Sequence, residues 1–127
     1  MLNFGRPRAI WLCVGTVDGR KGIDGLYGIV KEDLGHDPLS GSVFAFTNRR
    51  RNRMKLLFAD GSGQCLFIKR LERGGFRWPQ VVEGQKSVEI SAGQLALLLS
   101  GLEPVVRARP GWWRGMLPAV SVIKVRK

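Results

Sequence analysis

The chain has few of the side chains that catalytic and metal sites require. Its 127 residues include 2 cysteines and 1 histidine, which are scattered and do not make a zinc site. The Walker-type phosphate loop is also absent. A metal-dependent nuclease needs carboxylates that converge on two cations, but the aspartates in turn-rich contexts have local explanations. These explanations are a helix cap for Asp18, an ion pair with Arg20 for Asp24, an Asp-Pro loop for Asp37 and a hairpin turn for Asp60.

The cysteines offer no nucleophile either. Cys13 or Cys65 would need a neighbouring base, and the lone histidine, His36, lies in a loop sequence that specifies no partner. Each cysteine lies inside an apolar, strand-like run, which is typical of buried thiols in a reducing compartment rather than of a disulfide. The sequence therefore predicts a protein that is not an enzyme, with no catalytic residues, metal ligands, cofactor or small-molecule substrate.

Long hydrophobic runs are missing as well. The longest apolar runs, such as Leu95–Leu99, are far too short to span a bilayer, and the N-terminus has no signal-peptide core. We therefore expect a cytoplasmic protein.

Acidic side chains are scarce relative to basic ones. The 10 acidic residues stand against 21 lysines and arginines and leave a formal net charge of +11. Such self-repulsion destabilises a compact state unless an anion relieves it, so the charge favours a polyanionic partner. Nucleic acid is favoured over a membrane surface or a purely solubilising role. The length and the hydrophobic content of 44% are those of one globular domain.

The N-terminal part of the chain predicts a strand followed by a helix. Residues 9–14 form an unbroken apolar run, typical of a strand covered on both faces. Apolar residues fall on helical spacing across 20–34, with Asp18 as a candidate N-cap and Gly35 as the stop. Glycines recur at positions 19, 22, 25 and 28. Because glycine weakens a helix, they predict close packing of the helix backbone on the sheet, with direct approach of a partner as the alternative.

The middle of the chain predicts an antiparallel meander. Its strand-like runs, with short turns between them, are 43–47, 54–59, 64–71 and the start of a run at 76–78. Period-two alternation places Met54, Leu56 and Phe58 on one core-facing side, and it directs Leu66 and Ile68 towards the core.

The C-terminal part predicts a short strand at 88–90 and a second helix. Ser91 is a candidate N-cap with Gln94 placed for a capping box, and Gly101 helps to end the helix. The expected buried face consists of Leu95, Leu98, Leu99 and Leu102. Together the elements predict an α+β fold, an antiparallel β-meander with two helices packed on it. We divide the chain into a domain over residues 1–102 and a basic aromatic tail over 103–127, with a candidate strand at 120–125.

Positive charge gathers in two clusters. The turn at 48–53 carries four arginines, and a second cluster, interspersed with Phe76 and Trp78, follows the third strand of the meander. Guanidinium groups suit phosphate, and an exposed aromatic ring would stack on an unpaired base, although core positions are favoured for both aromatics. Two further basic residues, Arg20 and Lys21, lie in the first turn of the predicted first helix. The candidate nucleic-acid-binding residues are Arg49, Arg50, Arg51, Arg53, Lys55, Lys69, Arg70, Arg73, Arg77, Arg20 and Lys21.

Several segments, in this order and spacing, resemble a known family. They are 18–26 (DGRKGIDGL), 37–41 (DPLSG), 43–51 (VFAFTNRRR), 55–57 (KLL), 60–63 (DGSG) and 69–79 (KRLERGGFRWP). They resemble the TnpB accessory protein, which is encoded by the second reading frame of bacterial insertion sequences of the IS-sixty-six class. The resemblance covers residues 4–102. An unrelated RNA-guided nuclease shares the name, and this chain is far too short to be that protein.

The resemblance implies a role in transposition beside a separate, larger transposase, and it supplies no catalytic residues. We expect a non-catalytic accessory factor of a bacterial mobile element that binds DNA through backbone phosphates, which set position without reading sequence. The alternative is an adaptor that binds the transposase or a companion protein without contacting DNA. An RNA-binding module is a third possibility.

Overall fold

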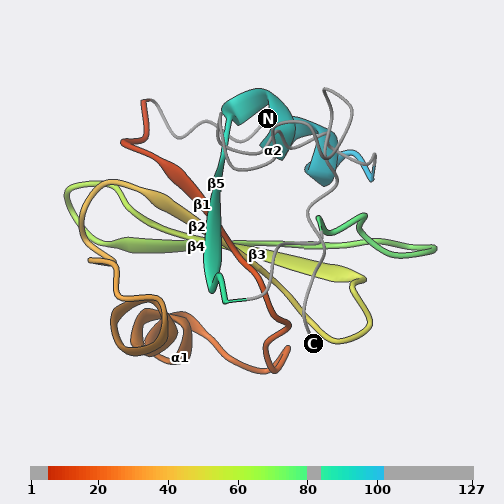
Figure 1. The fold of residues 1–127 in the computed structure, drawn as a ribbon, viewed down its shortest axis with the longest axis horizontal. Helices are drawn as coiled ribbons and strands as arrows, with labels where there is room; N and C mark the ends of the chain where they lie inside the picture. The colour runs from red at the N-terminus through yellow and green to blue at the C-terminus, as the bar shows by residue number, and fades with distance from the viewer. Residues whose placement is uncertain (1–5, 80–83, 102–127) are drawn as a thin grey trace.

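The computed structural model describes residues 6–79 and 84–101. They form a five-stranded sheet between two helical layers (Figure 1). The strand order across the sheet is β4-β3-β2-β1-β5. In chain order the strands are β1 (Ile10–Cys13), β2 (Val43–Thr47), β3 (Arg53–Ala59), β4 (Gln64–Arg70) and β5 (Ser87–Ile90). The helices are α1 (Ile23–Gly28), which continues as the π-helical segment η1 (Ile29–Asp33), and α2 (Ala92–Leu99).

Strands β2, β3 and β4 form the predicted antiparallel meander. Phe44 lies opposite Leu57, which in turn lies opposite Leu66, so three strands contribute to one apolar row. Strand β1 pairs parallel to β2 and antiparallel to β5, which makes the whole sheet mixed. A parallel pair requires a crossover connection, and α1 with η1 lies in that connection. The α+β class is confirmed, and the parallel pair extends it beyond a pure meander.

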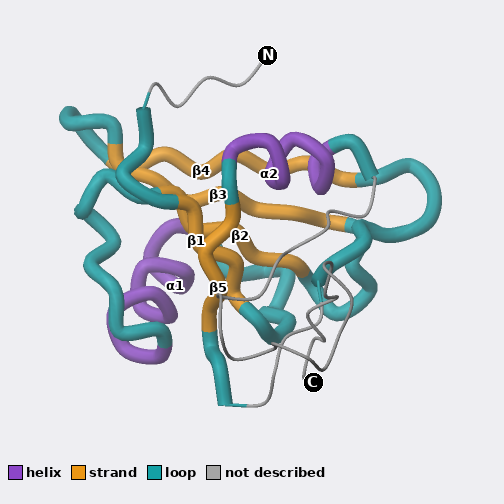
Figure 2. The backbone as a smooth tube through the Cα atoms, turned by 45° about the horizontal axis from the view of Figure 1, so that its top comes forward, coloured by secondary structure: helices purple, strands orange, loops and turns teal. Residues whose placement is uncertain are grey.

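Each face of the sheet carries its own core. On one face, Leu26 of α1 and Val30 of η1 are fully buried in a cluster with Phe44 of β2. On the other face, Leu95 and Leu98 of α2 join the cluster built on alternate residues of the same strands. Figure 2 shows α1 and α2 on opposite sides of the strands. Alternation along the strands therefore buries both faces, as the continuous apolar runs of β1 and β2 require.

The first helix begins later than predicted. Gly22 is its N-cap, with no side-chain hydrogen bond. Asp18 accepts the backbone N–H of Arg20 at 2.9 Å and forms an ion pair with the Arg20 side chain, so it does not cap the helix. The predicted pair between Asp24 and Arg20 is wrong for the same reason, because the two-residue turn brings Asp18 closer. Gly35, with a φ of +71°, ends the helical segment as predicted.

The recurrent glycines do not pack against the sheet, contrary to the prediction. A Cβ atom at Gly22 or Gly28 would meet no atom of the described residues within 4 Å. A Cβ atom at Gly25 would meet the stem of Lys21 at 3.2 Å, so this glycine lets the lysine side chain lie along the helix. Only Gly19, in the loop before α1, comes close to the sheet end.

Residues 76–78 form no strand, which corrects the prediction of another strand there. Phe76 and Trp78 are only 3% and 5% exposed, and both lie in the core on the α2 face. Trp78 Nε1 donates a hydrogen bond to the carbonyl oxygen of Cys13 at 2.9 Å. The alternating pattern therefore reflects a loop that Phe76 and Trp78 attach to the core. The prediction that both aromatics are core residues is confirmed.

Strand β4 is less buried than its sequence suggests. Met54, Leu56 and Phe58 of β3 lie in the α2-side cluster as predicted. Leu66 packs into the α1-side cluster, but Ile68 on the same face is 51% exposed. The α1-side cluster therefore includes Leu66 but does not extend to Ile68 on this edge strand, and the predicted core position of Ile68 is wrong.

Helix α2 has the N-terminus that its sequence predicts. The Ser91 hydroxyl accepts the N–H of Gln94 at 3.1 Å, and the Gln94 side chain accepts the N–H of Ser91 at 2.8 Å. This capping box is confirmed, and Gly101 follows the helix with a φ of +81°. Across residues 6–79 and 84–101, neither helix has the length and apolar character needed to cross a bilayer. Leu102 and the predicted tail lie outside the described residues.

Candidate nucleic-acid interface

Basic residues from three segments converge at one end of the sheet. Strands β1, β2 and β4 finish there and β3 begins there, because β1 and β2 are parallel and the meander strands alternate. The loop before α1, the turn between β2 and β3, and the segment after β4 therefore meet. We call this surface the basic end, and we define it by Arg20, Lys21, Arg49, Arg50, Arg51, Arg53, Arg70 and Arg73.

Two asparagines hold the turn between β2 and β3. Asn48 Oδ1 accepts the backbone N–H groups of Asn52 and Arg53, both at 3.1 Å. Asn48 Nδ2 donates to Asn52 Oδ1 at 2.8 Å. The turn backbone is thereby fixed, with Arg49 and Arg50 exposed on it. Neither asparagine was among the candidate site residues, although asparagine is favoured in turns.

The same turn rests on the segment that follows β4. Arg51 has a φ of +59°, a left-handed conformation that is unfavourable for a residue with a side chain, and its carbonyl oxygen accepts the N–H of Phe76. The carbonyl of Asn52 accepts the N–H of Leu71 at 2.8 Å. A Cβ atom at Gly75 would lie 3.1 Å from the Arg51 carbonyl oxygen, so glycine allows this close contact. These contacts bring the segment that contains Arg73 beside the arginine turn.

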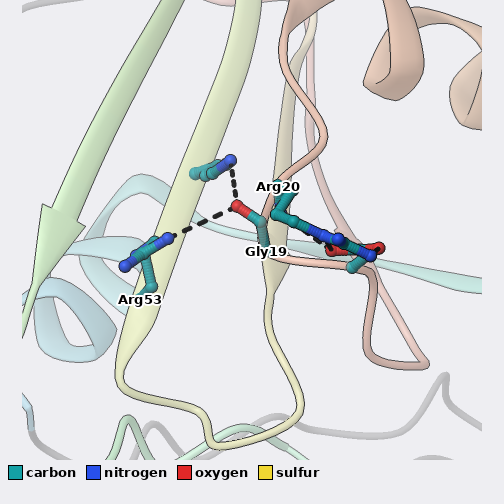
Figure 3. A network of polar contacts seen from close by, with 5 residues as sticks. Gly19, Arg20 and Arg53 are labelled. Atoms are coloured by element: carbon teal, nitrogen blue, oxygen red, sulfur yellow. Dashed lines mark hydrogen bonds and ion pairs between the residues drawn. The ribbon is translucent and has the colours of Figure 1, made fainter.

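Arg53 and Arg70 form a like-charged pair across the sheet. They lie directly opposite each other on β3 and β4, an arrangement that is destabilising by itself. Arg53 reaches the loop before α1, where its NH1 donates to the carbonyl oxygen of Gly19 at 3.4 Å (Figure 3). Figure 3 places Gly19 between Arg53 and Arg20, so this carbonyl connects two segments of the basic end.

Lys55 is buried and also binds the loop before α1. Its side chain is on the α1 face, and the residue is only 6% exposed. Its Nζ donates to the carbonyl oxygens of Gly19 at 2.7 Å and Lys21 at 2.6 Å. Burial lowers the pKa of Lys55, and the neighbouring positive charge of Arg53 lowers it further. The ammonium group is thus directed inward, although the sequence suggested contact with phosphate.

Lys69 is also engaged within the fold. Its Nζ donates to the carbonyl oxygen of Leu99 at 2.6 Å, at the last turn of α2. A cation in this position satisfies a free helix carbonyl and complements the helix dipole. Lys69 thus lies on the α2 face, whereas its neighbour Arg70 lies on the α1 face and is exposed. The structure separates two residues that the sequence placed in one cluster.

Arg20 differs from the turn arginines because an acidic side chain faces it. Its guanidinium group contacts both carboxylate oxygens of Asp18, at 3.1 Å and 2.9 Å. These hydrogen bonds hold the pKa of Asp18 well below its ordinary value. In the described part of the chain, no carboxylate lies within ion-pair distance of Arg49, Arg50 or Arg73. Within the described part of the chain, Arg20 is thus the only cation of the basic end that pairs with a carboxylate, and the turn keeps its positive charge uncompensated.

Arg77 lies apart from this group. It is exposed between the buried Phe76 and Trp78, and it makes an interaction within the protein. Because both aromatic rings are in the core, neither is available to stack on a base.

The described residues provide no candidate metal centre, since no three histidine, cysteine or acidic side chains gather among them. A cavity of about 610 Å³ opens beside the basic end, at the carboxyl end of β1. Its wall includes two lysines, Lys21 and Lys86, and two aspartates, Asp18 and Asp33. The opposing charges balance, so the cavity has no clear preference for an anion.

Comparison with known proteins places these features in a family. The family model described as IS66 Orf2 like protein matches residues 8–108. Two proteins of Sinorhizobium fredii are similar, "Uncharacterized protein y4hO" with 41% identity and "Uncharacterized protein y4jC" with 37% identity. Each alignment spans 103 residues, which is 81% of this chain and 88% or 86% of the relative. None of the solved structures matches the chain.

The chain is a small insertion-sequence-associated protein built on a mixed sheet with a basic end. It belongs to the IS66 Orf2 like family. The family resemblance in the sequence is thereby confirmed.

Proposed function

We propose that the protein is an accessory factor for insertion-sequence transposition that binds DNA phosphates through its basic end. The observation that carries this proposal is the rigid turn with Arg49 and Arg50 exposed and without ion pairs in the described part of the chain. Fixing the turn before binding reduces the entropy lost when phosphates are engaged. The family membership supports the setting of transposition.

The like-charged pair at the sheet end supports the same function. Arg53 and Arg70 repel each other across β3 and β4 in the free protein. A phosphate between them would replace this repulsion with two charge-assisted hydrogen bonds. Arg73 and Arg51, in the segments on either side, extend the same positive surface. Lys55 and Lys69 are not part of the proposed contact surface, because their ammonium groups bind backbone carbonyls.

The proposed contacts give little base specificity, since phosphate contacts set position and carry no direct sequence information. Duplex DNA is the proposed ligand because the buried aromatics leave no stacking platform for single strands among the described residues. Preference for single-stranded RNA over duplex DNA of equal length would contradict this assignment.

The test compares two pairs of arginines that carry the same charge at different places. Arg49→Ala with Arg50→Ala removes two charges from the turn. Arg6→Ala with Arg8→Ala removes two exposed charges near the start of β1, at the other end of the sheet. Duplex DNA affinity should fall about tenfold or more for the turn pair and much less for the control pair. Equal losses would show that net charge, and not the turn, determines binding.

The same variants separate DNA binding from an adaptor role. Pull-down of the transposase of the same element should be unchanged by the turn substitutions if they act only on DNA. An intact DNA affinity together with lost transposase capture would instead identify the turn as a protein-binding surface.

A further inference from the structure

Strand β4 has the properties of an edge that is open to pairing. It is the first strand in the sheet order, so its outer side has no partner strand among the described residues. It pairs with β3 without interruption along all 7 residues, so no bulge distorts it. Natural edge strands are usually protected by shortness, proline, bulges or charge. The centre of β4 has none of these, since positions 65–68 read CLFI.

The one lysine of β4 does not protect this edge. Lys69 directs its ammonium group to the Leu99 carbonyl, over the α2 face. Arg70 carries charge only at the end of the strand. Ile68, in the apolar centre, is 51% exposed. The open edge thus carries an apolar side chain that the described residues do not cover.

We propose that β4 pairs antiparallel with β4 of a second copy of this chain, joining the two sheets into one. Centring the pairing on Phe67 is the only register that pairs all residues of β4 with themselves. Residues directly opposite share a face in antiparallel pairing. Ile68 then lies opposite Leu66 of the partner subunit, and the reverse contact follows from the two-fold symmetry.

The positions of the charged residues of β4 favour antiparallel pairing with a second copy. In the register centred on Phe67, Lys69 faces Cys65 and Arg70 faces Gln64, so every cation of β4 lies opposite an uncharged side chain. A parallel pairing would instead bring like cations together along the strands, which is unfavourable. Phe67 meets Phe67 of the partner subunit on the two-fold axis, and cross-strand aromatic pairs are stabilising.

The pairing surface shares only Arg70, at the end of β4, with the proposed phosphate contacts, and its apolar centre at positions 65–68 is not among them. Dimerisation can therefore fail while DNA binding holds, and the reverse is also true. Sedimentation equilibrium of the full chain across the micromolar range tests it first. The wild-type chain should sediment as a dimer in equilibrium with the monomer, and a monomer at every concentration would overturn the proposal.

Substitution at the edge tests the surface. Ile68→Arg should yield a monomer, because each partner would bury a charge beside the other's Leu66. The matched control is Leu97→Arg, since Leu97 is 40% exposed on α2. The control should remain a dimer with an unchanged circular dichroism spectrum. Dimerisation that persists in Ile68→Arg would show that the interface lies elsewhere.

Cross-linking tests the register without relying on the charged variant. In a Cys65→Ser background, Phe67→Cys places two thiols directly opposite each other, at a Cβ separation of about 5 Å. Ile68→Cys places them diagonally, about 7–8 Å apart, too far for an unstrained disulfide. Mild oxidation should join the position-67 variant much faster than the position-68 variant. The opposite order, or no cross-link in either variant, would overturn the proposed pairing.

Discussion

Lys55 Nζ lies 2.7 Å from the carbonyl oxygen of Gly19, so a lysine in the middle of β3 holds the loop that precedes α1. The second carbonyl that it binds, that of Lys21, belongs to the same loop. The backbone of that loop approaches the β2–β3 turn, and Gly19 lies near the Cβ atom of Asn48. One buried cation thus determines where two segments of the basic end meet.

Replacing Lys55 should therefore cost stability. Lys55→Met keeps most of the aliphatic stem but leaves the Lys21 carbonyl without this donor and the Gly19 carbonyl with only the longer bond from Arg53. We expect a loss of about 1–3 kcal/mol. Lys31→Met is the control, because Lys31 is exposed on η1. It should change the free energy of unfolding by less than about 0.5 kcal/mol. Urea denaturation measures both, and equal values would show that the buried hydrogen bonds contribute nothing.

Asn48→Ala tests the turn without changing any charge. The substitution removes the three side-chain hydrogen bonds that close the turn around the arginines. We expect the free energy of unfolding to fall by about 1–3 kcal/mol. Duplex DNA affinity should fall at constant net charge, because the arginines would no longer be held in place before binding. An unchanged affinity in the folded variant would show that turn rigidity is irrelevant to binding.

Cys13 gives stability a defined pH dependence. Burial raises the pKa of its thiol from 9.0 to about 11, the charge of Asp33 adds to this, and the backbone N–H of Gly15 opposes it. The folded pKa exceeds the unfolded one, so this stabilisation is complete below pH 9 and is lost as the pH rises towards 11. Relative to Cys13→Ala, the wild-type protein should lose about 2–3 kcal/mol across that window. Parallel slopes for the two proteins would contradict the burial of this thiol.

Two glycines should respond in opposite directions to alanine. Gly28 is inside the helical segment and a Cβ atom there is unobstructed, so Gly28→Ala should stabilise by about 0.5–1 kcal/mol. Gly75→Ala would press on the carbonyl oxygen of Arg51, and we expect it to destabilise by about 1–3 kcal/mol. Thermal unfolding of the two variants measures the difference. A destabilising Gly28→Ala would indicate a contact at that helix surface.

Local sequence patterns predicted the parts of the fold that depend on local physics. The meander runs, the Ser91 capping box and the stop at Gly35 follow from period-two alternation, helix capping and positive φ, which are short-range effects. The same reasoning failed where two local interactions compete for one side chain. Asp18 was expected to cap a helix, but a turn with Arg20 took its carboxylate instead.

The candidate site shows the same division. The arginine turn was recognisable as a cluster, yet the sequence could not separate Lys55 and Lys69 from their basic neighbours. Their roles depend on the carbonyl groups of Gly19 and Leu99, which are at least 30 residues away in the sequence. Likewise, the alternation pattern of β4 indicated burial of Ile68, but the α1-side cluster includes Leu66 and does not extend to Ile68.

The salt dependence of DNA binding tests the central claim most directly. Engagement of about 4–6 phosphates should give a slope of log K against log salt of about −4 to −5 on duplex DNA, because each contact releases condensed counterions. With Arg49→Ala and Arg50→Ala together, the slope should become shallower by about 2, while the Arg6→Ala and Arg8→Ala control keeps the wild-type slope. A flat salt dependence in the wild-type protein, or a slope that the turn variant leaves unchanged, would contradict phosphate binding at the basic end.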